Sequence, residues 1–131
     1  MANDKFMMEY ALILEKKQMY VDNMKGVLSS SMPDEDKKNV LIVFCRKVNE
    51  LIMDARKIYY DTKSSNREVE FEQSKQVLKD CIALQSKIYE NIIEFETNSE
   101  MAIRYGIGIK SNDSLIEKIN NEYVSDVEKT K

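Results

Sequence analysis

Few residues in the chain have side chains that usually carry out catalysis or bind metals. The sequence contains two cysteines, Cys45 and Cys81, and no histidine. Histidine is the usual general base near neutral pH, a common zinc ligand and the normal partner of a thiol nucleophile. We therefore interpret both cysteines as small apolar side chains near the middle of the second and third predicted helices, next to core positions. We expect no metal and no cofactor.

Two further patterns bear on catalysis. The stretch "YGIGIKS" (105–111) contains glycines, but it lacks the GxxxxGK[ST] spacing and the preceding strand of a phosphate-binding loop. The carboxylates Glu94, Glu96 and Glu100 are expected on a solvated helix surface rather than in an acid–base pair. We therefore predict that the protein is not an enzyme, with no catalytic residues and no small-molecule substrate.

The basic residues near the predicted helix corners are the candidates for contact with RNA or DNA. They are Lys37, Lys38, Lys63 and Arg67. Tyr59 and Tyr60 are aromatic side chains able to stack on bases, but packing is the simpler explanation for them. The net charge of −3, from 20 basic and 23 acidic residues, indicates no overall attraction to nucleic acid.

The composition indicates long helices that must position these residues. Of the 131 residues, 43% are hydrophobic and 33% charged, and only three are glycine and one proline. Few helix breakers and many Lys, Glu, Leu, Ile and Met residues favour helices over short strands. We predict a single all-α domain over 1–131, an antiparallel four-helix bundle with a short last helix. The predicted helices cover about 5–28, 34–61, 66–96 (or to 105) and 114–128.

Three local patterns place the ends of these helices. The only proline, Pro33, follows Met32 and precedes three acidic residues at 34–36, which suits a helix start because carboxylates favour the positive end of the helix dipole. Ser65 with Glu68, and Ser114 with Glu117, have capping-box spacing. "GIGIKSND" (106–113) is expected to be a loop, with Gly106 as the left-handed cap that ends the third helix; whether that helix already breaks at 97–100 stays open.

Two predicted helices carry apolar residues away from their core face. In the first, the core side is marked by Phe6 and Ile13, and three apolar residues fall almost opposite it. In the second, three share a line roughly 130° from the Leu41–Val48 seam, taking about 100° per residue. Scattered exposed side chains or a wide core are the alternatives, but methionines favour an adaptable interface. The predicted interface residues are Met8, Leu12, Met19, Ile42, Met53 and Tyr60.

The stretch "SSSMPDEDKKNVLIVFCRKVNELIMDARKIYYDTKSSNREVEFEQSKQVLKDC" (29–81) resembles the four-helix-bundle proteins of the ribosomal-RNA intervening-sequence type. It is also similar to their relative, the accessory variability determinant of diversity-generating retroelements. The resemblance rests on Met32-Pro33 before a charged turn, an apolar helix that reaches Ala55, and a third helix led by Arg67. It implies a homo-oligomeric, non-enzymatic bundle that binds a reverse transcriptase and its template RNA.

Three classes of function remain. The first is a non-enzymatic adaptor or accessory protein that acts through protein–protein association and oligomerises with itself. The second is a nucleic-acid-associated accessory factor of a mobile element, and the third a small inhibitory or immunity protein that captures one effector. The N-terminal "MANDKFMMEY" has early acidic residues and no long apolar core, unlike a secretory signal. With two cysteines and no CxxC pair, the sequence favours a cytoplasmic location.

Overall fold

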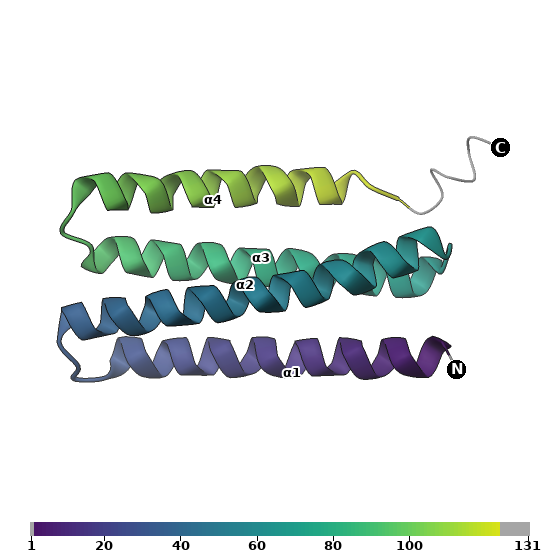
Figure 1. Ribbon diagram of the computed structural model, residues 1–131, viewed down its shortest axis with the longest axis horizontal. Helices are drawn as coiled ribbons and strands as arrows, with labels where there is room; N and C mark the ends of the chain where they lie inside the picture. Colours follow the sequence, from purple (N-terminus) through teal and green to yellow (C-terminus); the bar gives the residue numbers. More distant parts are fainter. Residues whose placement is uncertain (1, 124–131) are drawn as a thin grey trace.

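The computed structural model describes residues 2–123, which fold into four helices (Figure 1). They are α1 (Ala2–Ser29), α2 (Asp34–Ser64), α3 (Glu68–Phe95) and α4 (Ser99–Asn120). Each helix runs antiparallel to the one before it (Figure 1). The prediction of an all-α, antiparallel four-helix bundle is confirmed.

The central pair of the bundle is α2 and α3, which pack against each other more extensively than any other two helices. Helix α1 packs mainly on α2 and to a smaller extent on α3, whereas α4 packs mainly on α3. In Figure 1, α1 and α4 lie on opposite sides of this central pair. Both outer helices therefore have a face that no other described helix covers.

The hydrophobic core lies mainly between α2 and α3, because α3 contacts the other three helices. The outer helices add fewer buried residues to it. Helix α3 buries thirteen residues, but α4 buries only Ile119. On α1, Phe6, Ile13 and Met24 are buried and form its core-facing side. The largest fully buried side chains come from α2 and α3: Tyr59, Phe71, Leu41, Leu51, Leu78, Ile82, Ile88 and Ile92.

The corner between α1 and α2 forms as the sequence predicts. Pro33 is the N-cap of α2, and its carbonyl accepts the backbone N–H of Lys37 at 3.0 Å. Residues 34–36 place three carboxylates in the first turn, where the helix dipole favours negative charge. The Lys37 ammonium donates to the carbonyl oxygen of Leu28 at 3.2 Å, which ties the end of α1 to the start of α2.

The prediction for the last helix was wrong, because α4 begins at Ser99 rather than at 114 and is 22 residues long. The predicted loop 106–113 is helical, and among the described residues no glycine has a positive φ, so Gly106 is not a left-handed cap. The chain instead breaks at 96–98, where the side chain of Asn98 accepts the backbone N–H of Met101 at 3.1 Å. Residues 124–128 of the predicted last helix lie outside the described residues.

The two predicted capping boxes were also wrong. Helix α2 continues to Ser64, and Arg67, not Ser65, is the N-cap of α3, with no side-chain hydrogen bond. The turn between them passes through Asn66, whose φ is 55°. Ser114 lies inside α4 and caps no helix. None of the helices within residues 2–123 combines the length and the apolar character needed to cross a membrane.

Candidate functional site

The outer face of α1 carries three apolar side chains that sequence periodicity placed away from the core. Met8, Leu12 and Met19 expose 75%, 50% and 45% of their surface. They point away from the side of α1 that carries the buried Phe6 and Ile13, because at about 100° per residue they fall nearly opposite it. We call these three residues the α1 stripe, and Figure 1 shows that α1 forms one edge of the molecule.

The predicted α2 residues do not extend the α1 stripe. Met53 and Tyr60 are exposed, but Tyr60 lines a shallow groove with Leu115 and Lys118 of α4. Leu12, in contrast, lines a groove between α1 and the other side of α2. Leu12 and Tyr60 therefore belong to two separate surfaces.

Ile42 differs from the other five predicted interface residues. Its side chain is partly buried and packs against the hydrophobic core. Successive helical residues are only about 100° apart, so Ile42 lies on the flank of the buried face marked by Leu41 and Cys45 rather than opposite that face. The prediction that it lies outside the core was wrong.

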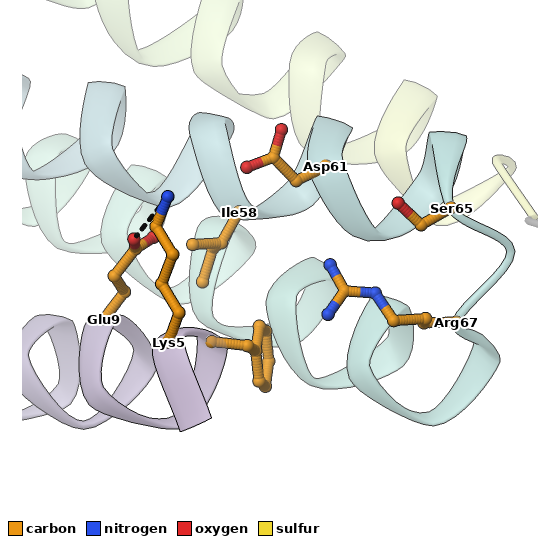
Figure 2. Close-up of a pocket in the computed structure, with 7 residues that line it drawn as sticks. Lys5, Glu9, Ile58, Asp61, Ser65 and Arg67 are labelled. Atoms are coloured by element: carbon orange, nitrogen blue, oxygen red, sulfur yellow. Dashed lines mark ion pairs between the residues drawn. The ribbon is translucent and has the colours of Figure 1, made fainter. Parts of the chain in front are cut away.

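A mixed-charge pocket lies at the end of the bundle where α1 begins (Figure 2). Its volume is about 190 Å³, and it is lined by Lys5, Phe6, Glu9, Ile58, Asp61, Ser65 and Arg67. Lys5 and Glu9 form an exposed ion pair at 3.9 Å, which Figure 2 marks, and Arg67 pairs with Glu70 at 2.9 Å. With both signs of charge present and partly paired, the pocket has no preference for an anion or a cation.

The four candidates for nucleic-acid contact form two groups, at opposite ends of α2. Lys37 and Lys38 lie in its first turns, whereas Lys63 and Arg67 lie at or just beyond its last turn. Since a helix rises about 1.5 Å per residue, Lys38 and Lys63 are roughly 37 Å apart. They do not form one basic patch.

Each of these four side chains also has a partner within the chain. Lys37 caps the end of α1, and Lys38 pairs with Glu35 at 3.1 Å and with Glu96 at 3.3 Å. The hydrogen bond to Glu35 is the main reason that the pKa of Lys38 is raised. Lys63 pairs with Glu122 at 3.0 Å. An electrostatic contact with phosphates would have to compete with these pairs.

The two cysteines lie in the core, as their apolar surroundings predict. Burial raises the pKa of Cys45 to about 11 and the pKa of Cys81 to about 12. A thiol with such a pKa is protonated at neutral pH and is a poor nucleophile and metal ligand. Among residues 2–123, no group of three or more His, Cys, Asp or Glu side chains is placed to hold a metal ion.

Sequence analysis missed a polar cluster that fastens the end of α4 to α2 and α3. Lys75 on α3 is only 6% exposed. Its ammonium donates to the carbonyl oxygens of Asn120 at 3.2 Å and Glu122 at 2.8 Å, and it lies 4.4 Å from the ring centre of Tyr123. The Glu122 carboxylate accepts hydrogen bonds from Tyr59 and from Lys63.

The charges in this cluster stabilise one another. Burial alone would raise the pKa of Glu122, but the hydrogen bonds from Tyr59 and Lys63 outweigh it and hold that pKa below its usual range. For Tyr59, burial and the neighbouring carboxylate both raise the pKa. At neutral pH the cluster therefore holds a neutral Tyr59 phenol beside the Glu122 carboxylate.

The comparisons with known proteins do not identify a family. No family model matches the chain, and no curated protein and no solved structure is similar enough to count as a match. The resemblance of residues 29–81 to the intervening-sequence type of bundle stays a prediction.

Proposed function

We propose that the protein is a non-enzymatic association module that uses the α1 stripe to bind a second copy of itself. The observation that carries the proposal is the exposure of Met8, Leu12 and Met19 on the uncovered face of α1. Single exposed apolar residues are normal on a protein surface, but several in one row are typical of an interaction surface.

The free energy available from this surface is sufficient for self-association. Burying a Met or Leu side chain contributes about 1.5–3 kcal/mol. A symmetric pair of copies would bury six such side chains, and methionines adapt their shape to the surface they meet. Part of this free energy is offset by the loss of translational and rotational freedom, so we expect association at micromolar concentration.

The other candidate sites support a binding role rather than a catalytic one. The thiols of Cys45 and Cys81 are buried and protonated at neutral pH. The basic residues at both ends of α2 are engaged in pairs within the chain. Unlike the buried thiols and the paired basic residues, the side chains of the α1 stripe are exposed.

Light scattering after size-exclusion chromatography tests the proposal. The wild type should have a molar mass above that of the 15.3 kDa monomer at micromolar concentration, and Leu12→Glu should return it to the monomer mass. Ile107→Glu is the matched control, because Ile107 is a similarly exposed aliphatic residue, at 60%, on α4. Circular dichroism should show unchanged helix content in both variants.

Two outcomes would contradict the proposal. A monomeric wild type at all accessible concentrations would exclude self-association. Equal loss of mass in Leu12→Glu and Ile107→Glu would show that the α1 stripe has no special part in it.

A further inference from the structure

We infer that two copies pair through α1 in an antiparallel orientation, with Met8 of each copy opposite the partner's Met19. The inference rests on the proposed self-association and specifies its geometry. It follows from the spacing of the apolar residues along α1 and from the charges that flank them.

The α1 stripe belongs to a regular seam. Residues 8, 12, 15, 19, 22 and 26 follow each other at alternating steps of four and three, which is the spacing of the contact line in a two-helix coiled coil. All six are exposed. Helix α1 forms one edge of the molecule (Figure 1), and at about 100° per residue the centre of the seam lies nearly opposite the side of α1 that carries Phe6 and Ile13, so a second copy can approach it in either orientation.

Charge distinguishes the two orientations. Two of the seam positions are acidic, Glu15 and Asp22. In a parallel pair each residue lies level with the same residue of the partner. Glu15 would therefore face the partner's Glu15, and Asp22 the partner's Asp22. Like charges that face each other across a desolvated seam are unfavourable, and a parallel pair has two such contacts.

An antiparallel pair with Met8 level with the partner's Met19 separates the two Asp22 side chains by seventeen residues of helix and offsets the two Glu15 side chains by roughly 4.5 Å along the axis. In this register Glu15 lies level with the partner's Leu12, and Asp22 with the partner's Lys5. The two Leu12 side chains fall on either side of the two-fold axis, roughly 4.5 Å apart along the helix at 1.5 Å per residue. All three apolar residues of each copy are then covered.

The charges beside the seam also favour this register. Glu9 and Lys16 lie on the same flank of α1, toward α2, where both line the groove next to Leu12. In the antiparallel register Glu9 comes within two residues of the level of the partner's Lys16, a distance that long side chains span. The two-fold axis repeats this pair, so the interface has two opposite-charge pairs on one rim.

Thiol cross-linking tests the orientation. Met8→Cys and Met19→Cys are prepared separately and treated with a short bismaleimide, alone and as a one-to-one mixture. In the antiparallel pair, two thiols introduced at position 8 are separated by eleven residues of helix, roughly 16 Å along the axis. A thiol at position 8 instead lies level with a thiol at position 19 of the other copy. We therefore expect several-fold more cross-linked dimer in the mixture than in either variant alone.

The native thiols do not interfere with this reading. Cys45 and Cys81 are buried, so the wild type should not cross-link. Glu117→Cys places an exposed thiol on α4, away from the proposed interface, and should also remain uncross-linked. Molar mass is measured on the same samples before the reagent is added.

Each outcome supports or contradicts a distinct statement. Cross-linking of each variant alone, with no gain in the mixture, would show a parallel pair: the inference would fail and the proposed function would stand. A dimeric mass without cross-linking in any sample would place the interface away from α1 and overturn both. A monomeric mass would overturn the proposed function itself.

A charge exchange tests the register independently. Glu9→Lys and Lys16→Glu, made singly, should each raise the dissociation constant roughly threefold to tenfold, since two exposed pairs become like-charged. The double variant Glu9→Lys/Lys16→Glu should restore the wild-type value. In a parallel pair neither change creates or removes an opposite-charge contact, so the absence of any effect in the single variants would contradict the antiparallel register.

Discussion

At the scale of single residues, Lys75 is a charged side chain buried on the core-facing side of α3. It shares a face of α3 with the buried residues Phe71 and Leu78, so simple periodicity places a charge in the core. Sequence analysis did not single out this lysine. A lysine at such a position needs partners, and the carbonyls of Asn120 and Glu122 supply them. Those partners could not be predicted, because they depend on where α4 ends.

The contribution of Lys75 is testable by substitution. Lys75→Met keeps the apolar stem but leaves two carbonyl groups without their donor, so we expect the free energy of unfolding to fall by roughly 1–3 kcal/mol. Lys79→Met is the matched control, since Lys79 lies one turn further along α3 and donates only to the Asn120 side chain at an exposed site. Urea unfolding followed by circular dichroism measures both.

A structural role in fastening α4 predicts more than lost stability. Amide hydrogen exchange in the last turns of α4, residues 115–120, should speed up in Lys75→Met more than in the centre of α3. Equal losses of stability in the Lys75 and Lys79 variants, or uniform exchange along the chain, would be evidence against this role.

At the scale of helices, sequence reasoning succeeded where the signal is local. The corner at Pro33 was predictable because a proline and three acidic residues specify a helix start by themselves. It failed at α4, where Gly106 and Gly108 indicated a loop. Gly108 lies inside α4 and lets this helix pass close to α3, since a Cβ atom there would lie 3.0 Å from the Tyr89 ring. That contact joins residues of different helices, so it cannot be predicted from the residue pattern of α4 alone.

The two glycines of α4 should respond differently to alanine. No atom lies within 4 Å of a Cβ added at Gly106, so Gly106→Ala should raise the free energy of unfolding by about 0.5–1 kcal/mol through helix propensity. Gly108→Ala gains the same propensity but pushes against Tyr89, so it should be clearly less stable than Gly106→Ala. Thermal or urea unfolding of the two variants gives the comparison.

The same pair of variants distinguishes a helix from a loop at this position. If Gly106 adopted the left-handed conformation of a helix cap, alanine there would be destabilising rather than stabilising. A loss of stability in Gly106→Ala would therefore contradict the helix over Ser99–Asn120.

At the scale of the whole molecule, the relative rotation of the helices decides which residues share a surface. Periodicity within α1 sufficed to place Met8, Leu12 and Met19 opposite the core. It could not show that Tyr60 lies beside Leu115 and Lys118 of α4, because the angle between two helices depends on how their core faces pack. The sequence thus predicts single stripes, and the assembled bundle determines whether two stripes make one surface.

The burial of titratable groups between α2 and α3 predicts that the free energy of unfolding falls at alkaline pH. Burial raises the pKa of Cys81 from 9.0 to about 12 and that of Tyr89 from 10.0 to about 12. The folded protein then keeps protons that the unfolded chain releases above pH 9. The stability that these groups contribute is complete below pH 9 and is lost as pH rises toward 12. We expect Cys81 alone to lower the free energy of unfolding by about 1 kcal/mol between pH 7 and pH 10.

Substitution of the buried thiol isolates this effect from the other alkaline titrations. Cys81→Ala should be less stable than the wild type at pH 7, but its further loss between pH 7 and pH 10 should be smaller by about 1 kcal/mol. Val77→Ala, which truncates another buried residue of α3 without a titratable group, should show the same loss with pH as the wild type. If all three proteins lose equal stability between these pH values, the Cys81 thiol is not held protonated by the core, and the packing of α2 against α3 around it must be looser than described.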